Sequence, residues 1–407
     1  MRYLALFLHI YQPPTQTPEI LKQVTQEAYT KIIDTLNQSK KGKITLNINA
    51  CLTEMLEENG YKEVVESLSH LGREGKIEFV SSGKYHPILP LIPEEEILRQ
   101  IQLNNLTNKK LIGSVYSPKG FFPPEMCISE KLLEILNDRG FTYVIGDEIS
   151  TGEFADFRKY IYKVKGLNLS LFVRNRHLSD SIASPDIMGL KDIKEVIDSI
   201  PDNSYAIIAS DGEFYGHHHK GKEKLLSEFL NTGEFTQVTI SELSGIFKEQ
   251  KEIPICSSSW SSFPEDFSLG ASWRHWFDPT NKIHKLQWEL TYGVINYFRN
   301  ISLNQEGFQE GRNKLDKALH SCQYWWASER PWWSKDMIFK GLDLYKEAVE
   351  AMKQDSEEKQ KLLNLVLYIK DTVNKYEKEG SVNQIRESFY KLHPEFIRDA
   401  FIEKEEK

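Results

Sequence analysis

The sequence has few cysteines, and they do not cluster. Its four cysteines, Cys51, Cys127, Cys256 and Cys322, are scattered along 407 residues without a C-x-x-C pair. Disulfide-stapled secreted domains and zinc ribbons need cysteines at close and regular spacings, so both classes are excluded. This usage is typical of proteins in a reducing compartment, and we expect a cytoplasmic location.

Long apolar runs and basic blocks are also missing. No stretch approaches the roughly 20 apolar residues that a membrane-spanning helix needs. The opening "MRYLALFLHIYQPP" has no small-residue cleavage site and runs into His9 and two prolines, which favours a buried first strand over a signal peptide. The formal net charge is -8, so neither a nucleic acid nor an anionic membrane is an expected partner.

Short apolar runs alternate with amphipathic segments between residues 3 and 210, and this alternation indicates βα units and a parallel sheet. The helical pattern is clearest at residues 93–111, which begin with a proline and three acids, and at 129–140, which begin with a capping serine. The seven strand-like runs are "YLALFLH", "ITLNINA", "KIEFVSS", "PKGFFPP", "FTYVIGD", "LSLFVRN" and "SYAIIAS".

The pattern changes near residue 284, where helical periodicity continues without strand-like runs between the helices. We therefore predict a catalytic domain over residues 1–283, which includes a long Trp-rich loop, and a helical region over 284–407 that completes the site. The charged end "FIEKEEK", residues 401–407, is expected to fray.

Two acids follow strand-like runs, where the active sites of parallel barrels are built. Glu125 in "GFFPPE" comes after two prolines that stiffen the backbone, which suits a nucleophile, although a role limited to a helix N-terminus is the simpler alternative. Asp211 follows "SYAIIAS", a run buried enough to keep a carboxyl protonated, as a general acid requires; alone, it would more simply be read as a helix cap or turn residue. Together the two acids meet the requirement for cleaving a glycosidic bond.

Other polar and aromatic residues accompany the two acids. Apolar sugar faces stack on aromatic rings, and an indole N–H can donate to a hydroxyl, so the tryptophans of two irregular segments favour a sugar-binding site over simple packing. The candidate substrate-binding residues are His9, Gln12, Glu78, His86, Asp180, His217, Trp273, Trp325 and Trp326.

Five short motifs in order resemble glycoside hydrolase family 57, a family that acts on α-glucans. They are "HIYQP" at His9, "GKIE" ending at Glu78, "GFFPPE" ending at Glu125, "DGEFYG" at Asp211, and "YWW" at residues 324–326. Each motif is weak by itself, and five in order across residues 9–326 are specific. The chain departs from the family where Tyr11 replaces a second histidine, where Phe121 and Phe122 replace a tryptophan, and where no acid precedes "YWW"; these departures concern the choice of substrate more than the reaction.

The resemblance implies an α/β fold, a distorted seven-stranded (β/α) barrel followed by a C-terminal helical region. It implies a retaining glycosidase with Glu125 as nucleophile and Asp211 as acid/base, with His9, Glu78 and Trp325 lining the sugar subsite. It further implies no metal and no cofactor, and an α-glucan or maltooligosaccharide as substrate.

Three alternatives stay open on the sequence. The stretch "DGEFYGHHHKG" combines acids with His217, His218 and His219, which could indicate a metal-dependent polysaccharide deacetylase, but adjacent histidines on an extended loop point apart. A non-catalytic glucan-binding protein is a second alternative, against which the two carboxylates argue. A 4-α-glucanotransferase or a branching enzyme would use the same two acids as a hydrolase.

Overall fold

The computed structural model describes residues 1–153 and 157–393. The chain divides into two compact units, unit 1 (Met1–Trp260) and unit 2 (Ser261–Lys407). The functional boundary predicted at residue 283 stays a prediction, and the charged end at 401–407 lies outside the described residues. In the part of the chain that the structure describes, no helix is both long and apolar enough to cross a bilayer.

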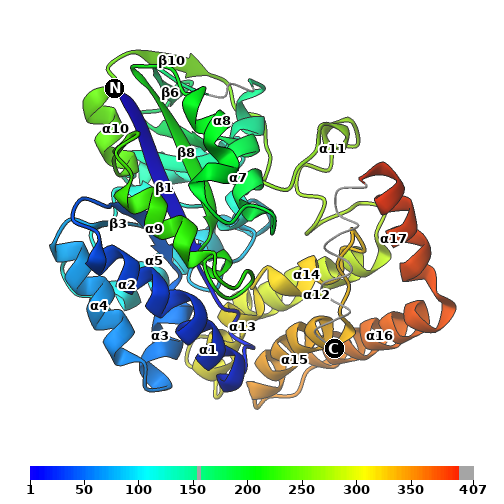
Figure 1. Cartoon of the computed structure of the whole chain (residues 1–407). Helices are drawn as coiled ribbons and strands as arrows, with labels where there is room; N and C mark the ends of the chain where they lie inside the picture. The colour runs from blue at the N-terminus through cyan, green and yellow to red at the C-terminus, as the bar shows by residue number, and fades with distance from the viewer. Residues whose placement is uncertain (154–156, 394–407) are drawn as a thin grey trace. The chain divides into compact units, whose positions relative to one another are not determined.

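All seven predicted runs of unit 1 form strands (Figure 1). They belong to two sheets, with strand orders β3-β2-β1-β8 and β10-β6-β7-β5-β4. Within these sheets the seven strands pair in parallel, which confirms the predicted barrel topology. The strands are β1 (Arg2–Ile10), β2 (Ile44–Ile48), β3 (Ile77–Val80), β4 (Gly120–Phe121), β5 (Tyr143–Asp147), β7 (Ser170–Arg174) and β8 (Ser204–Asp211).

The two sheets meet at two seams, and this makes the barrel distorted. At the seam between β3 and β4, the Phe122 amide donates to the Ser81 carbonyl at 2.8 Å. At the seam between β7 and β8, the Asn175 amide donates to the Ile207 carbonyl at 2.8 Å. Each sheet therefore carries its own part of the barrel rim.

Three short strands were not predicted. β6 (Ile161–Val164) pairs antiparallel with β7, and β10 (Gln250–Ile253) extends that sheet beyond β6. β9 (Thr236–Gln237) pairs with the first residues of β1, ahead of the stretch that pairs with β2. β9 and β10 consist largely of exposed polar residues, so they lack the apolar alternation that marks the barrel strands.

The side chains of the strands alternate between two cores, as a period of two residues requires. Phe7 and Ala209 belong to the core inside the barrel, whereas Leu8 and Ile208 pack outward under the helices. The inner core also contains Ile240 from α10 (Ile240–Ile246).

The helices of unit 1 begin where the sequence predicts in the two clearest cases. Residues 94–111 form α5 with three acids in its first turn, and the Ser129 hydroxyl caps α6 by accepting from the Leu132 amide at 3.2 Å. The helices are α1 (Pro18–Val24), α2 (Thr30–Gln38), α3 (Ala50–Glu58), α4 (Lys62–Arg73), α5 (Glu94–Leu111), α6 (Glu130–Asp138), α7 (Arg176–Ala183), α8 (Lys194–Asp198), α9 (Glu223–Asn231) and α10.

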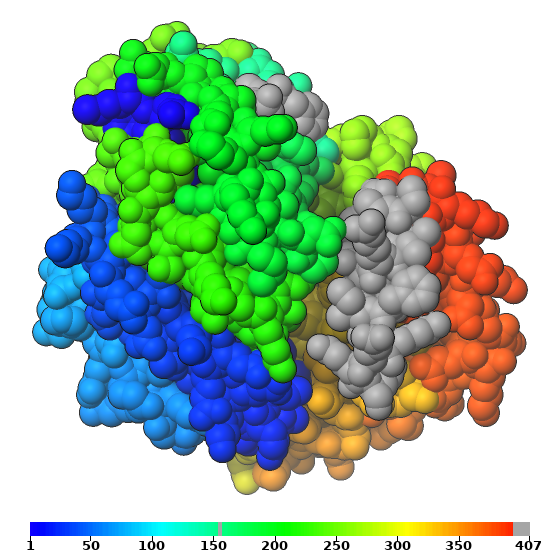
Figure 2. All heavy atoms as spheres, in the orientation of Figure 1, coloured from blue at the N-terminus to red at the C-terminus, as the bar shows by residue number. Residues whose placement is uncertain are grey.

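In Figure 2 the blue surface of the first helices adjoins the green surface around α9. A direct bond agrees with this view, because the hydroxyl of Ser39, at the end of α2, donates to the Leu230 carbonyl of α9 at 2.8 Å. The outer face of β1 and β8 is thus covered by helices that also contact each other.

Unit 2 confirms the predicted helical region. The hydroxyl of Thr291 bonds with those of Tyr324 at 2.6 Å and Tyr345 at 2.9 Å, so one buried polar cluster ties three helices together. The helices are α11 (Pro264–Ser268), α12 (Lys282–Arg299), α13 (Phe308–Ala318), α14 (Cys322–Trp325), α15 (Lys335–Ala351), α16 (Glu357–Glu379) and α17 (Ser381–Leu392).

Candidate active site at the carboxyl end of the barrel

Asp211 and His9 lie side by side at the ends of β8 and β1, where they are register partners. Both follow the inward-facing positions Ala209 and Phe7 by two residues, so their side chains also belong to the inner face. This rim is where parallel barrels assemble their active sites.

The imidazole of His9 is held in one tautomer. Its Nδ1 lies 2.8 Å from Oδ1 of Asn47, its register partner on β2. Because an amide oxygen only accepts, Nδ1 carries the proton, and burial lowers the pKa of His9 to about 4. The ring is therefore neutral at pH 7, and its Nε2 is an acceptor.

Glu125 sits in a single helical turn, Pro124–Met126, directly after β4. The indole Nε1 of Trp260 donates to its Oε2 at 3.0 Å, and the Trp260 amide donates to its carbonyl at 3.2 Å. The Glu125 side chain is 16% exposed. The carboxylate is thus fixed by a neighbour and still accessible.

His86 is a further neighbour of Glu125. Its Nδ1 lies 3.6 Å from Oε1 of Glu125, and its ring stacks on Tyr11 at 4.3 Å and on His9 at 4.8 Å. Both Glu125 (φ 59°) and His86 (φ 57°) adopt the left-handed backbone conformation that non-glycine residues rarely take. Each such residue costs about 1–3 kcal/mol, and such strain concentrates at functional sites.

Asp211 lies in surroundings that disfavour its ionised form. Burial is the main cause that raises the pKa of Asp211 well above its ordinary value, and the charges of Glu213 and Glu125 raise it further. The charge of Arg174 acts in the opposite direction and does not cancel these effects. These effects favour the protonated form of Asp211, and the influence of the Glu125 charge means that the two carboxyl groups are close enough to interact.

Gln12 joins the site through a further acid, Glu213. Oε1 of Glu213 accepts from the Tyr29 hydroxyl at 2.6 Å, from the Tyr11 amide at 3.3 Å and from Nε2 of Gln12 at 3.4 Å. Burial raises the pKa of Glu213, and these donors oppose the shift. Glu213 was not among the predicted site residues, although it follows Asp211 by two positions in the fourth motif.

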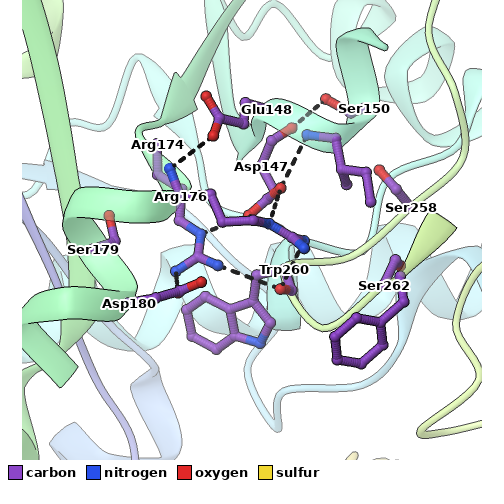
Figure 3. A network of polar contacts seen from close by, with 12 residues as sticks. Asp147, Glu148, Ser150, Arg174, Arg176, Ser179, Asp180, Ser258, Trp260 and Ser262 are labelled. Carbon is purple, nitrogen blue, oxygen red and sulfur yellow. Dashed lines mark hydrogen bonds and ion pairs between the residues drawn. The ribbon is translucent and has the colours of Figure 1, made fainter. Parts of the chain in front are cut away.

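Asp180 belongs to a network with Arg174 and Asp147 (Figure 3). Its Oδ1 accepts from Arg174 at 2.8 Å, and Arg174 also donates to Oδ2 of the fully buried Asp147 at 2.6 Å. Asp147 and Trp260 were not predicted. Asp147 ends the fifth strand-like run, so the strand-end rule could have found it, whereas no local pattern marks Trp260.

Glu78 is not brought to this rim. It is the second residue of β3, in register with Thr45, whose hydroxyl donates to its Oε2 at 3.0 Å. The Tyr143 hydroxyl donates to Oε1 at 2.8 Å, and the Ser241 amide of α10 donates to Oε2 at 3.2 Å. These donors, with the start of α10, place Glu78 toward the closed end of the barrel, where it ties strands together.

His217 and His219, from the run of three histidines, contact different partners. His217 Nδ1 lies 2.7 Å from Oε2 of Glu27, and His219 Nε2 donates to the Ala183 carbonyl at 3.0 Å. Among residues 1–153 and 157–393, no three His, Cys, Asp or Glu side chains are grouped so that they could hold a metal ion. The predicted role of His217 toward substrate stays a prediction.

The predicted tryptophans Trp273, Trp325 and Trp326 belong to unit 2. Trp325 is partly buried in an aromatic cluster, with ring centroids 4.9 Å from His275, 5.5 Å from Trp276 and 5.7 Å from Trp332. Their contact with sugar stays a prediction.

The sequence matches the model of glycosyl hydrolase family 57 over residues 5–256. An alpha-amylase of Pyrococcus abyssi is 28% identical over 214 residues, 51% of this chain and 32% of that protein. A 4-alpha-glucanotransferase of Thermococcus litoralis is 25% identical over 214 residues, with the same coverage. The chain spans less than a third of the length of the curated relatives it matches.

Solved structures share the fold. The crystal structure of the Thermococcus litoralis 4-alpha-glucanotransferase superposes with a TM-score of 0.65 and 19% identity, covering 87% of this chain and 60% of that one. A GH57-type branching enzyme of Pyrococcus horikoshii has a TM-score of 0.65 and 16% identity, covering 91% and 94%. Both likenesses support the distorted barrel with its helical region.

Proposed function

The chain belongs to glycosyl hydrolase family 57, and we propose that it cleaves α-glucosidic bonds in α-glucans with retention of configuration. Glu125 is the nucleophile and Asp211 the acid/base in this proposal. The observation that carries it is the different surroundings of the two acids: burial and neighbouring charges raise the pKa of Asp211, while the partly exposed Glu125 accepts a hydrogen bond from the Trp260 indole.

In the first step, a carboxylate oxygen of Glu125 attacks the anomeric carbon and forms a glycosyl ester. The bond to the departing sugar oxygen breaks, and that oxygen takes the proton of Asp211. A carboxyl whose pKa is raised suits this donation, because an ionised Asp211 would have no proton to give.

In the second step, Asp211, now ionised, removes a proton from an incoming hydroxyl, which attacks the anomeric carbon and releases Glu125. Water gives hydrolysis, and a sugar hydroxyl gives transfer or branching. The relatives named alpha-amylase and 4-alpha-glucanotransferase support an α-glucan substrate for either outcome.

His9 and His86 are proposed to contact the sugar whose bond is cut. His9 Nε2 can accept from a sugar hydroxyl, and His86 lies against both His9 and Glu125. Gln12, Asp180, His217 and the tryptophans Trp273, Trp325 and Trp326 are proposed to act at neighbouring positions of the glucan.

Replacing the nucleophile tests the assignment. We expect Glu125→Gln to lower kcat by roughly 10³-fold or more, on the order of 4 kcal/mol of barrier, with the fold retained. An activated fluorosugar should label Glu125 in the wild type. The matched control is Glu130→Gln, an exposed acid at the start of α6, which should keep normal turnover. Labelling at another residue would refute the assignment.

Replacing the acid/base separates the two steps. Asp211→Ala should slow poor leaving groups far more than good ones, and azide should restore activity by forming a glycosyl azide of retained configuration. An equal loss for all leaving groups without rescue would make Asp211 structural.

The products decide between hydrolysis and transfer. On incubation with maltooligosaccharides, exclusively shorter products would identify a hydrolase, longer linear products a glucanotransferase, and new branch points a branching enzyme. Formation of none of these products by folded protein would refute the proposed function.

A further inference from the structure

A buried acid, Asp147, lies between two arginines (Figure 3). Asp147 at the end of β5 is fully buried; its Oδ2 accepts from Arg174 Nε at 2.6 Å and its Oδ1 from Arg176 Nε at 3.0 Å. Burial lowers the pKa of Arg174, but the charges of Asp147 and Asp180 raise it, and the resulting pKa lies above its ordinary value. The Arg174 guanidinium therefore keeps its charge, and charge-assisted hydrogen bonds fix the three side chains to one another.

Both arginines also donate to one backbone carbonyl, that of Trp260. Arg176 donates to it at 3.0 Å and Arg174 at 3.3 Å. The guanidinium of Arg174 also lies 6.0 Å from the centroid of the Trp260 ring, within the range of a cation–π contact. In Figure 3 the two arginines converge on Trp260 from the side of Asp147.

Trp260 in turn contacts Glu125 at two points. Its indole N–H donates to Oε2 of Glu125 at 3.0 Å, and its amide donates to the Glu125 carbonyl at 3.2 Å. The two residues are 135 positions apart in the sequence, so only the tertiary structure brings them together.

We propose that Asp147, Arg174 and Arg176 form a clamp that holds Trp260 in place, and that Trp260 is a positioning residue that orients the carboxylate of Glu125 for attack. The proposal rests on the proposed function, because it gives Glu125 the role of nucleophile.

The physical reason is the narrow geometry of the displacement. A carboxylate turns easily about its last carbon–carbon bond, and a nucleophile must be held within about 0.5 Å of its productive position. A hydrogen bond to one oxygen stops this rotation, provided that the donor itself is fixed. The clamp fixes this donor, the Trp260 side chain, by holding the backbone carbonyl of the same residue.

The primary test is Trp260→Phe, which keeps an aromatic ring and removes the indole N–H. We expect kcat for maltooligosaccharide cleavage to fall roughly 10- to 100-fold, with little change in KM or melting temperature. The acidic limb of the kcat/KM profile should move to higher pH, because a carboxylate that loses a donor binds a proton more readily.

The chain offers a control outside the predicted sugar-binding segments. The Tyr162 hydroxyl donates to Oε2 of Glu153 at 3.1 Å, so Tyr162→Phe removes a hydrogen bond to a carboxylate elsewhere in unit 1. This variant should keep the wild-type rate and pH profile. A Trp260→Phe enzyme with the same rate and pH profile as the control would overturn the proposal.

A double-mutant cycle between Arg176 and Trp260 tests the clamp. Arg176→Gln removes a charged donor to the Trp260 carbonyl and should lower kcat in the wild type, with Arg176→Lys retaining more activity. In the Trp260→Phe background the same change should cost much less, since the indole bond that the clamp supports is already gone. Equal losses in both backgrounds would overturn the clamp, and if Arg176→Gln does not fold, Arg176→Lys is used in the same cycle.

Failure of the proposed function gives a different result. In that case folded wild-type protein would not act on maltooligosaccharides, or Glu125→Gln would keep full turnover. If the wild type is active and Glu125→Gln is inactive, an unchanged kcat of Trp260→Phe refutes the positioning role and leaves the proposed function standing.

Discussion

Glu329 in unit 2 provides a test of the electrostatics that does not depend on any activity. Its side chain is 3% exposed, its backbone has a φ of 59°, and within the described residues its Oε1 has no hydrogen-bond partner. Burial, with a smaller effect from the charge of Asp278, raises the pKa of Glu329 from 4.5 to about 7.

The sign of the effect on stability follows from where the proton is held. Between pH 4.5 and 7 the folded chain keeps the proton of Glu329, whereas the unfolded chain releases it. The stabilisation from this proton is fully present below pH 4.5 and is lost as the pH rises to 7. At about 1.4 kcal/mol per pH unit, the loss is about 3 kcal/mol.

The variant Glu329→Gln carries a neutral group of the same shape at every pH. We expect it to be more stable than the wild type at pH 8, by up to about 3 kcal/mol, and to show no such gain at pH 4.5. Urea unfolding at the two pH values measures the difference. An exposed acid of the same unit, Glu358→Gln, is the control without a pH-dependent gain. An equal gain at both pH values, or lower stability at pH 8, would refute the reasoning.

Three further outcomes are expected. His9→Ala should lower kcat/KM roughly 5- to 150-fold and, by leaving Asn47 without its partner, should also lower the unfolding free energy by about 1–3 kcal/mol; unchanged turnover would remove His9 from the site. Asp147→Ala should destabilise the fold by about 3–5 kcal/mol in urea, because two arginines lose their buried counter-ion, and a neutral effect would contradict the ion cluster. Treatment with a chelator should leave the conversion of maltooligosaccharides unchanged, whereas release of acetate from an acetylated polysaccharide that a chelator abolishes and zinc restores would favour a deacetylase.

The barrel strands could be predicted because they are buried on both faces. A run such as "SYAIIAS" contributes alternately to the inner and outer cores, so nearly every residue is apolar or small. β10 could not be predicted in this way, because three of its four residues are at least partly exposed and polar, and its pairing with β6 is decided by the tertiary structure.

The strand-end rule found the rim residues that the structure brings together. Glu78 was predicted from its motif instead: it is the second residue of β3 and bonds within the barrel, and its contact with sugar stays a prediction. Trp260 is a site residue that the sequence did not predict. It contacts Glu125 across 135 positions, and a single tryptophan in an irregular segment carries no local signal of that contact.

The two seams of the barrel have a consequence for how activity depends on temperature. Asp211 and His9 extend from the sheet β3-β2-β1-β8, whereas Glu125 follows β4, which belongs to the other sheet. The spacing of the two carboxyl groups is thus set across a junction between sheets and not along one continuous ladder. Local opening needs less free energy than global unfolding. We therefore expect heat inactivation to begin below the temperature at which the barrel melts, with amides at the seams, such as those of Phe122 and Asn175, exchanging with deuterium before those in the middle of β1.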